Sequence, residues 1–304
     1  TALQTATILD TAFFAEDQFS VTDRLKLVAG TRTDAIHLDR EGFTATGASN
    51  ALQTFSQNFT ATTWRAGVVY DVLPEATVYG QYATAVDPVS SSLFVARANQ
   101  KFELATGMQW EVGAKGQFWN KRAEWTVAYF DIVRKNILTQ ISQIDALNVG
   151  RQSSKGVELD VAAKLTDAWR IQGNITFLSA KFDKFAQLSG GVPISRNGNR
   201  PPEVPQAVAN LWSIYRVSTP IPFDVGAAMR YVGDRYNDPA NTIRLKPYMT
   251  ADAWMSVPYK QFWITLRGRN LFDKSYAIFG SQFYPNQVLM GAPRTVELSV
   301  MGRF

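Results

Sequence analysis

The stretch "WRIQGNITF", residues 169–177, alternates between apolar and polar side chains along most of its length. Its apolar members are Trp169, Ile171, Ile175 and Phe177, and its polar members are Arg170, Gln172, Asn174 and Thr176. Successive side chains of a β-strand point to opposite faces of the sheet, so this pattern predicts a strand with one apolar and one polar face.

The same alternation recurs along the chain in "LKLVAGTRTD" (25–34), "EVGAKGQF" (111–118), "GVELDVAAK" (156–164), "FDVGAAMRY" (223–231) and "FWITLRGRN" (262–270). About thirteen segments fit this two-residue period, and no segment of helical length shows a 3.6-residue period. The sequence therefore predicts an all-β protein.

The connections between these segments alternate in length. Short ones such as "SVTDR", "VLPEA", "WNKRA" and "KLTDAW" are followed by long ones, at roughly 38–60, 86–109, 135–148, 183–205, 233–247 and 271–294. Antiparallel transmembrane β-barrels have short turns at one rim and large loops at the other. A soluble β-sandwich distributes long and short connections over both ends, so the alternation favours the barrel.

Aromatic residues of the apolar face lie near strand ends, as in the girdles that meet lipid headgroups: Trp64, Tyr70, Phe118, Trp169, Tyr231 and Phe262. The alternative interpretation is a packed aromatic core in a soluble β-rich binding or adhesion module. That module would expose its polar face to water and would stay in solution without detergent.

Composition limits the other classes of function. The 304 residues have a mean hydropathy of −0.14 and contain no apolar run of the roughly 20 residues that a transmembrane helix needs. Cysteine is absent, so the chain cannot contain a thiol nucleophile or a thiolate metal site. His37 is the single histidine and has no partners at the spacing of a catalytic triad. The net charge of +5 is scattered, which does not favour nucleic acid. We expect no enzyme and no metal site.

The last stretch, "GAPRTVELSVMGRF" (291–304), is a strand pattern that ends on Phe304. Bacterial single-chain barrels have even strand numbers and both ends in the periplasm, whereas the count here is odd and places Thr1 on the external side. We therefore expect residues 1–304 to be the C-terminal portion of a larger barrel. An even count with Thr1 at the periplasmic rim would instead indicate a complete passive diffusion porin of about 12–14 strands.

Several stretches resemble the C-terminal barrel of TonB-dependent receptors, and within them the ferric-siderophore branch: "LDTAFFAEDQFSVTDRLKLVAGTRTDAI", "ELATGMQWEVGAKGQFWNKRAEWTVAYFDIVRKNIL", "GVELD", "GNRPPEVPQAVANLWSIY", "NLFDKSY" and "GAPRTVELSVMGRF". The resemblance implies about 13 strands of a barrel of about 22, closed around an N-terminal plug. The plug and the early strands are missing from this chain.

The resemblance also implies a function. Such a receptor lies in the bacterial outer membrane as a monomer, among lipid and lipopolysaccharide. It binds a ferric siderophore through external loops and imports it with energy from the TonB–ExbB–ExbD complex. The siderophore is the transported ligand, and no covalent cofactor is implied.

Arginines can pair with the negative charge of such a ligand. Aromatic rings can stack on its flat chelating groups. The candidate ligand-binding residues on the long loops are Phe94, Arg97, Arg196, Arg200, Arg235, Tyr236, Arg244, Phe279, Phe283 and Tyr284. The alternative for each aromatic residue is packing within its loop, and for each cation it is contact with lipopolysaccharide. The predicted inner-wall charges are Glu111, Lys115, Glu158, Asp160, Arg170, Arg267 and Arg269, which would face the plug or pair across strands.

Overall fold

The protein is described by a computed structural model that covers residues 3–87, 103–140, 146–189, 192–280 and 287–302. Thirteen strands form one antiparallel sheet: β1 (Leu3–Ser20), β2 (Leu25–Phe43), β3 (Phe55–Leu73), β4 (Ala76–Asp87), β5 (Ala105–Phe118), β6 (Ala123–Gln140), β7 (Ala146–Lys164), β8 (Trp169–Lys184), β11 (Ala207–Val217), β12 (Phe223–Val232), β15 (Tyr248–Tyr259), β16 (Phe262–Arg269) and β19 (Thr295–Gly302). Among the residues described, no helix is long and apolar enough to cross a membrane. The predicted all-β class and the predicted strand number are confirmed.

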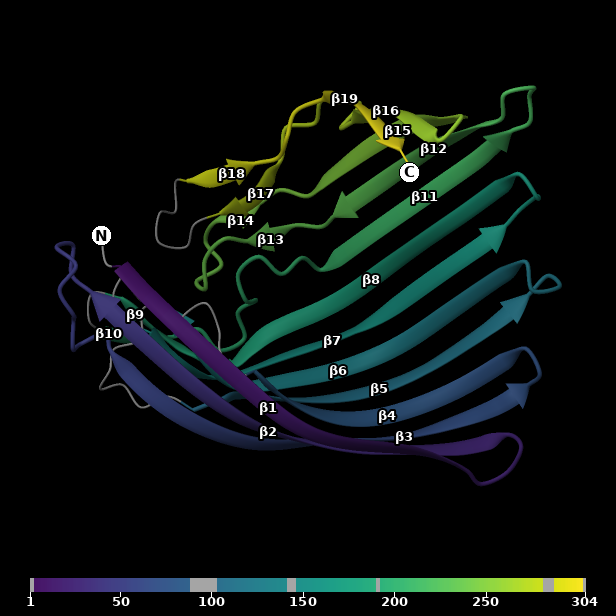
Figure 1. The fold of residues 1–304 in the computed structure, drawn as a ribbon. Coiled ribbons are helices and arrows are strands. Elements are labelled where there is room, and N and C mark those ends of the chain that lie inside the picture. The colour runs from purple at the N-terminus through teal and green to yellow at the C-terminus, as the bar shows by residue number, and fades with distance from the viewer. Residues whose placement is uncertain (1–2, 88–102, 141–145, 190–191, 281–286, 303–304) are drawn as a thin grey trace.

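Within the described residues, three two-stranded hairpins accompany the main sheet. They are β9 (Ala186–Ser189) with β10 (Val192–Ser195), β13 (Arg235–Tyr236) with β14 (Arg244–Leu245), and β17 (Ala277–Gly280) with β18 (Val288–Met290). Each is inserted in a long connection of the main sheet. All three lie at the same end of the sheet, opposite the short turns (Figure 1).

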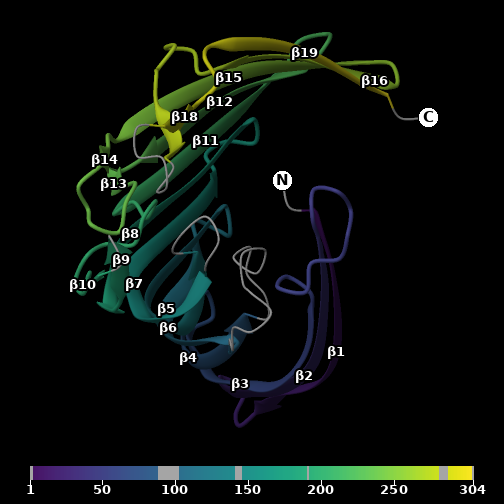
Figure 2. The same ribbon diagram turned by 90° about the vertical axis from the view of Figure 1, so that its left-hand side faces the viewer.

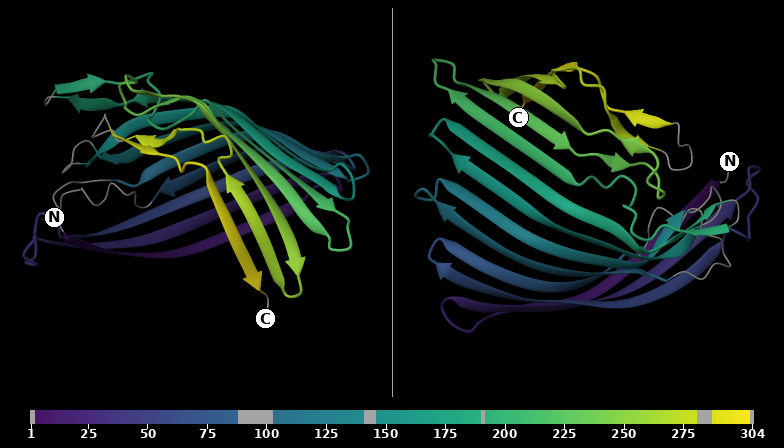
Figure 3. Two further views of the ribbon diagram at one scale, coloured as in Figure 1. Left: turned by 90° about the horizontal axis from the view of Figure 1, so that it is seen from above. Right: turned by 180° about the vertical axis from the view of Figure 1, so that it is seen from behind.

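The sheet curves into a wall that is C-shaped when seen along its axis (Figure 2). The strands pair in chain order, and the edge strands β1 and β19 lie on either side of the opening, each paired with one neighbour. The views from above and behind show the same continuous wall (Figure 3). Twist and regular stagger between strands produce this curvature.

The strands differ greatly in length, from 19 residues in β2 and β3 to 8 in β16 and β19. The long strands extend into regions that the sequence predicts as connections, since β2 continues to Phe43 and β6 to Gln140. On β2 the outward positions there, Asp39 and Glu41, are polar, which ends the alternation although the pairing with β1 continues. Phe304 lies outside the described residues.

The convex face of the wall carries a belt of apolar side chains. One row of register partners crosses it through Val68, Gly80, Val112, Tyr129, Val157 and Phe177. These side chains stay exposed, as shown by Val112 at 54% and Phe177 at 55%. No second sheet covers the belt within the described residues, and Trp169 is 40% exposed. So large an exposed apolar surface is typical of contact with a membrane and rules out the soluble sandwich.

The concave face is polar. One row of register partners on this face runs through Asp71, Thr77, Lys115, Thr126, Asp160, Asn174, Asn210 and Arg230. Asn210 Nδ2 donates to Asn174 Oδ1 at 2.9 Å. Cross-strand pairs include Arg269 with Glu297 (2.9 Å) and Arg65 with Glu16. The predicted orientation, with the apolar face outward and the charges inward, is therefore confirmed.

Candidate functional site

The long-loop end of the wall gathers three segments that are far apart in the sequence. They are residues 199–203 before β11, the β13–β14 hairpin and strand β17 (Figures 1 and 3). We call these three segments the rim. Hydrogen bonds and ion pairs connect each segment to the other two, so the rim is one unit.

Arg235 holds the centre of the rim. Its side chain is 4% exposed, and its Nε lies 2.7 Å from Oε2 of Glu203. Its Nη2 donates to the carbonyl oxygens of Ala277 and Ile278, each at 2.7 Å. The other carboxylate oxygen of Glu203 accepts a hydrogen bond from the backbone N–H of Gly280. The buried Arg235 and its partner Glu203, which is 23% exposed, therefore join all three segments.

A second, more exposed group of charges lies beside it. Asp234 Oδ2 is 3.5 Å from Nη1 of Arg200 and 3.2 Å from Nε of Arg244. The Arg200 guanidinium also lies 5.2 Å from the centre of the Tyr236 ring. The hydrogen bond from Arg244, aided by the charge of Arg200, lowers the pKa of Asp234 below its ordinary value of 3.8. Asp234 thus stays ionised at neutral pH between the two arginines.

This lowered pKa predicts a pH dependence. A carboxylate with a folded-state pKa below its unfolded value stabilises the fold above the unfolded pKa, and loses this effect as the pH falls through the folded value. We expect the difference in melting temperature between the receptor that carries this chain and its Asp234→Asn variant to be constant from about pH 8 to pH 5 and to shrink below about pH 4. A difference that already shrinks between about pH 7 and pH 5 would contradict the assignment.

The turn between β13 and β14 is fixed by its own side chains. Asp238 accepts hydrogen bonds from the backbone N–H groups of Thr242 (2.9 Å) and Ile243 (2.8 Å). Asn241, at a positive φ of 58°, donates to the carbonyl oxygens of Arg200 and Asp238. The hairpin is therefore held in place before any ligand arrives.

Below the rim, the concave wall contains a cavity of about 360 Å³. The Tyr248 and Tyr276 rings, stacked with centres 4.3 Å apart, lie at its edge. Arg230, Asp252 and Arg269 also line it. Asn270, which is 4% exposed, fixes the adjacent loop by donating to the carbonyl oxygens of Lys274 and Ala292, both at 3.0 Å. This accounts for the "NLFDKSY" stretch as a structural junction.

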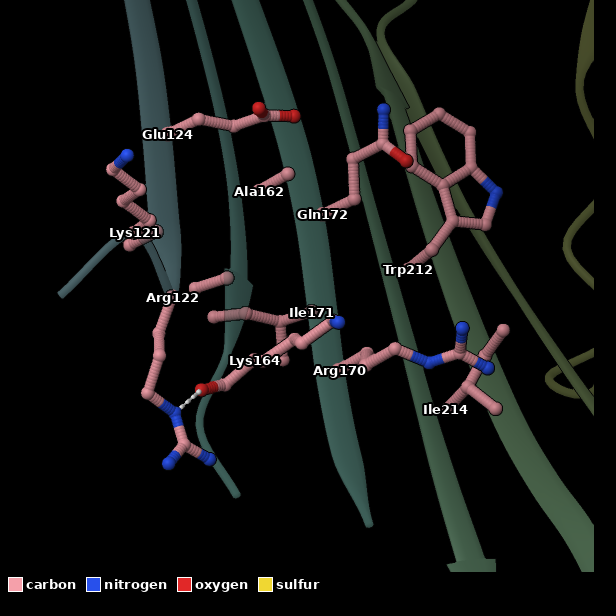
Figure 4. A pocket seen from close by; sticks show the side chains of 12 residues that line it. Lys121, Arg122, Glu124, Ala162, Lys164, Arg170, Ile171, Gln172, Trp212 and Ile214 are labelled. Carbon is pink, nitrogen blue, oxygen red and sulfur yellow. Dashed lines mark hydrogen bonds between the residues drawn. The ribbon is translucent and has the colours of Figure 1, made fainter. Parts of the chain in front are cut away.

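A second wall pocket, of about 330 Å³, lies at the short-turn end (Figure 4). Four basic residues line it, Lys121, Arg122, Lys164 and Arg170, together with one acidic residue, Glu124. Arg122 Nε donates to the carbonyl oxygen of Lys164 at 3.2 Å. The pocket is thus on the wall far from the rim.

The structure brings some of the predicted ligand-binding residues together. Arg200, Arg235, Tyr236 and Arg244 meet in the rim, and Phe279 extends from β17 with 51% of its surface exposed. Arg196 lies apart from them and donates to Gln187 of β9 at 2.9 Å. Phe94, Arg97, Phe283 and Tyr284 are outside the described residues.

Sequence reasoning missed the acidic and amide side chains that organise the rim, above all Glu203, Asp234 and Asn241. The "DPAN" turn at 238–241 was the one available signal, because Asp and Asn commonly bond their own turn backbone. His37 lies in β2 and contacts Asn58 and Asp39. Among the described residues, no group of three His, Cys, Asp or Glu side chains could hold a metal ion.

Residues 3–271 match the protein family described as TonB dependent receptor-like, beta-barrel. The chain belongs to the TonB-dependent receptor family. This assignment places it in an outer-membrane β-barrel, as the sequence resemblance predicts. The match begins in β1 and extends past the end of β16, so it covers nearly the whole wall.

Similar proteins of this family are named as siderophore receptors. The chain is 29% identical over 283 residues to the probable TonB-dependent siderophore receptor PiuA of Acinetobacter baumannii, covering 89% of this chain and 38% of PiuA. It is 28% identical over 251 residues to the ferrichrome outer membrane transporter/phage receptor of Escherichia coli K12, covering 80% of this chain and 32% of that protein. The chain thus spans about two fifths or less of these TonB-dependent receptors.

Solved structures of TonB-dependent receptors share the fold. The crystal structure of PiuA from Acinetobacter baumannii matches with a TM-score of 0.83 and 27% identity, over 97% of this chain and 43% of that one. The closed form of the ferric-catecholate import receptor Fiu from E. coli matches with a TM-score of 0.79 at 22% identity, which supports the fold alone. The similar proteins are receptors and transporters rather than diffusion porins.

Proposed function

We propose that this chain is part of an outer-membrane receptor that binds a ferric siderophore at its external loops and imports it with energy from the TonB–ExbB–ExbD complex. The family match and the siderophore receptors among its relatives carry this proposal. The rim adds physical support, because it presents arginines and aromatic rings at the long-loop end. The receptor makes or breaks no covalent bond in its ligand.

The domain organisation is part of the same proposal. Residues 1–304 form the C-terminal portion of a receptor barrel of about 22 strands that acts as a monomer. The share of the relatives that the chain covers, 38% for PiuA, supports this arrangement. Energy coupling then depends on a region outside this chain.

Within the rim, exposure separates two roles. Arg244 has a side chain that is 61% exposed and Phe279 is 51% exposed, so both can reach a ligand. Arg235 is buried against Glu203 and backbone carbonyls, so it positions the rim instead. A negatively charged chelate with flat groups would meet one guanidinium and one ring.

We expect Arg244→Gln and Phe279→Ala each to weaken binding of the iron chelate by about tenfold, the size of a single well-placed interface contact. Equilibrium binding of the ferric chelate to the purified full-length receptor measures this. Lys260→Gln, at a short turn of the opposite end, is the matched control and should leave binding unchanged. Unchanged binding in both rim variants would remove these residues from the site.

The function itself is tested by deleting the gene for the full-length receptor and growing the strain under iron starvation on a panel of ferric siderophores. We expect growth on one chelate class to be lost, and the same loss when TonB is removed. Normal growth of the deletion strain on every chelate would overturn the proposal. Uptake that continues without TonB would favour the porin.

A further inference from the structure

The two cavities of the concave wall share one side chain, Trp212 of β11. Trp212 lines the upper cavity, of about 360 Å³, below the rim, and also the lower pocket, of about 330 Å³, at the short-turn end. Its register partners are Gln172 of β8, which lines the lower pocket, and Ala228 of β12, which lines the upper cavity. Figure 4 shows the indole beside Gln172. The two cavities therefore meet at Trp212, which is 37% exposed.

One row of register partners crosses both cavities. From β6 to β15 it runs through Glu124, Ala162, Gln172, Trp212, Ala228 and Asp252. Glu124 is the second residue of β6 from its short turn, whereas Asp252 is the fifth residue of β15 from its long-loop end. The strands of a barrel are tilted, so such a row climbs around the wall. The two cavities thus form one inclined track from the rim to the short-turn end.

Six cations line the track: Lys121, Arg122, Lys164 and Arg170 in the lower pocket, and Arg230 and Arg269 in the upper cavity. Arg122 pairs with Asp167 at 3.1 Å, and Arg269 pairs with Glu297 at 2.9 Å. The other four make no ion pair within the described residues. Glu124 and Asp252 also line the track, so six cations and four carboxylates leave a net charge of +2.

The opposite flank of the concave wall is neutralised. The inward-facing cations of β2 and β3 are Lys26, Arg32, Arg40 and Arg65. Lys26 pairs with Asp71 at 3.9 Å, Arg32 with Asp34 at 2.7 Å, and Arg65 with Glu16. Arg40 is 1% exposed and donates to the carbonyl oxygen of Gln53 at 2.7 Å. An anion would have to replace existing partners on this flank, whereas the track offers cations without carboxylate partners.

Aromatic faces accompany the cations of the track. Tyr248 and Tyr276 are stacked at the edge of the upper cavity, with ring centres 4.3 Å apart, and Trp212 follows at the junction with the lower pocket. Cations and aromatic faces together suit a negatively charged chelate with flat groups. The rim presents the same combination in Arg244 and Phe279. The chemistry of the entrance therefore continues down one side of the wall.

We propose that the ferric chelate leaves the rim along this track, with the upper cavity and the lower pocket as successive transient binding sites and Trp212 between them. The inference rests on the proposed function and adds the side of the barrel through which the ligand passes. Several weak sites in series suit transport, because a site on the path has to release its ligand as well as bind it. The track is separate from the binding residues of the rim.

The test uses cells that carry the full-length receptor and the iron chelate whose use the deletion strain loses. Equilibrium binding to cells without TonB measures the rim, and TonB-dependent uptake at saturating chelate measures the passage. We expect Lys164→Gln combined with Arg170→Gln, and separately Trp212→Ala, to lower the uptake rate by about tenfold. Binding should stay unchanged, because these side chains lie outside the rim. Trp212→Phe keeps an aromatic face and should restore most of the rate.

Lys26→Gln combined with Lys115→Gln is the matched control. It removes the same charge from the concave face, outside both cavities, and should leave uptake unchanged. Normal uptake in the track variants, or an equal loss in this control, would overturn the track. Absence of binding to the unsubstituted receptor would overturn the proposed function instead.

Covalent labelling locates the passage directly. Ala162→Cys places a thiol in the lower pocket and Ala228→Cys places one in the upper cavity, and this chain has no other cysteine. A thiol-reactive derivative of the chelate should label both variants when TonB is active. Ala83→Cys, at the register partner of Arg65 on the opposite flank, should stay unlabelled. Equal labelling of Ala83→Cys, or no labelling of the two track variants, would contradict the proposed path.

Discussion

Replacing Arg235 with alanine is expected to lower the free energy of unfolding of the rim by about 3 kcal/mol, the lower end of the effect of breaking a buried ion pair, because Arg235 is buried but Glu203 is 23% exposed. The substitution leaves the Glu203 carboxylate without the guanidinium that lies 2.7 Å away. It also removes the donor that two carbonyl oxygens of β17 share. We expect hydrogen–deuterium exchange of the full-length receptor to rise together in residues 199–203, 233–247 and 277–280.

Arg244→Ala is the matched control for this experiment. Arg244 belongs to the same hairpin and also pairs with a carboxylate, but its side chain is 61% exposed. An exposed ion pair contributes about 0–1 kcal/mol, so exchange should change little. Equal exchange in the two variants, or an increase confined to the β13–β14 hairpin in Arg235→Ala, would show that Arg235 does not join the three segments.

Replacing Ile175 with arginine is expected to cost about 2–4 kcal/mol of stability in the bilayer, because the new charge would face hydrocarbon near the middle of the belt. Ile175 pairs in register with Leu159 on one side and Ala209 on the other, both on the convex face. We expect less folded receptor in the outer-membrane fraction. Urea unfolding of receptor reconstituted in bilayers measures the energy.

Thr176→Arg makes the same chemical change one residue further along β8. Thr176 is the register partner of Glu158 on the concave face, so the new cation would meet a carboxylate rather than lipid. Its folded yield should match that of the unsubstituted receptor. A similar loss in both variants would show that the two faces of β8 do not differ in environment.

The strands of the wall could be predicted from sequence because lipid outside and polar groups inside impose a two-residue period. The ends of the strands could not. Beyond the belt, outward positions such as Thr60 and Thr62 are polar, so both faces look alike in the sequence although the ladder between β2 and β3 continues. Backbone hydrogen bonds, which no side-chain pattern records, decide those boundaries.

The rim was predicted only in its residue types. The candidate residues include arginines and an aromatic residue that meet in the rim, but the sequence pattern shows neither which of them meet nor what surrounds them. Arg235 and Glu203 are separated by 32 residues in the sequence and become neighbours only through the order of β11, β12 and β13. Whether an arginine faces a ligand or holds a loop depends on such distant partners.

The unequal strand lengths have a consequence for access to the receptor. At about 3.4 Å per residue, the 19 residues of β2 and the 8 of β16 differ by roughly 37 Å along the strand. The wall is therefore high on the side of β2 and low on the side of β16, where the hairpins lie. We expect a large molecule such as an antibody to reach the hairpins over the low side of the wall. The long strands on the high side would block its approach from the opposite direction.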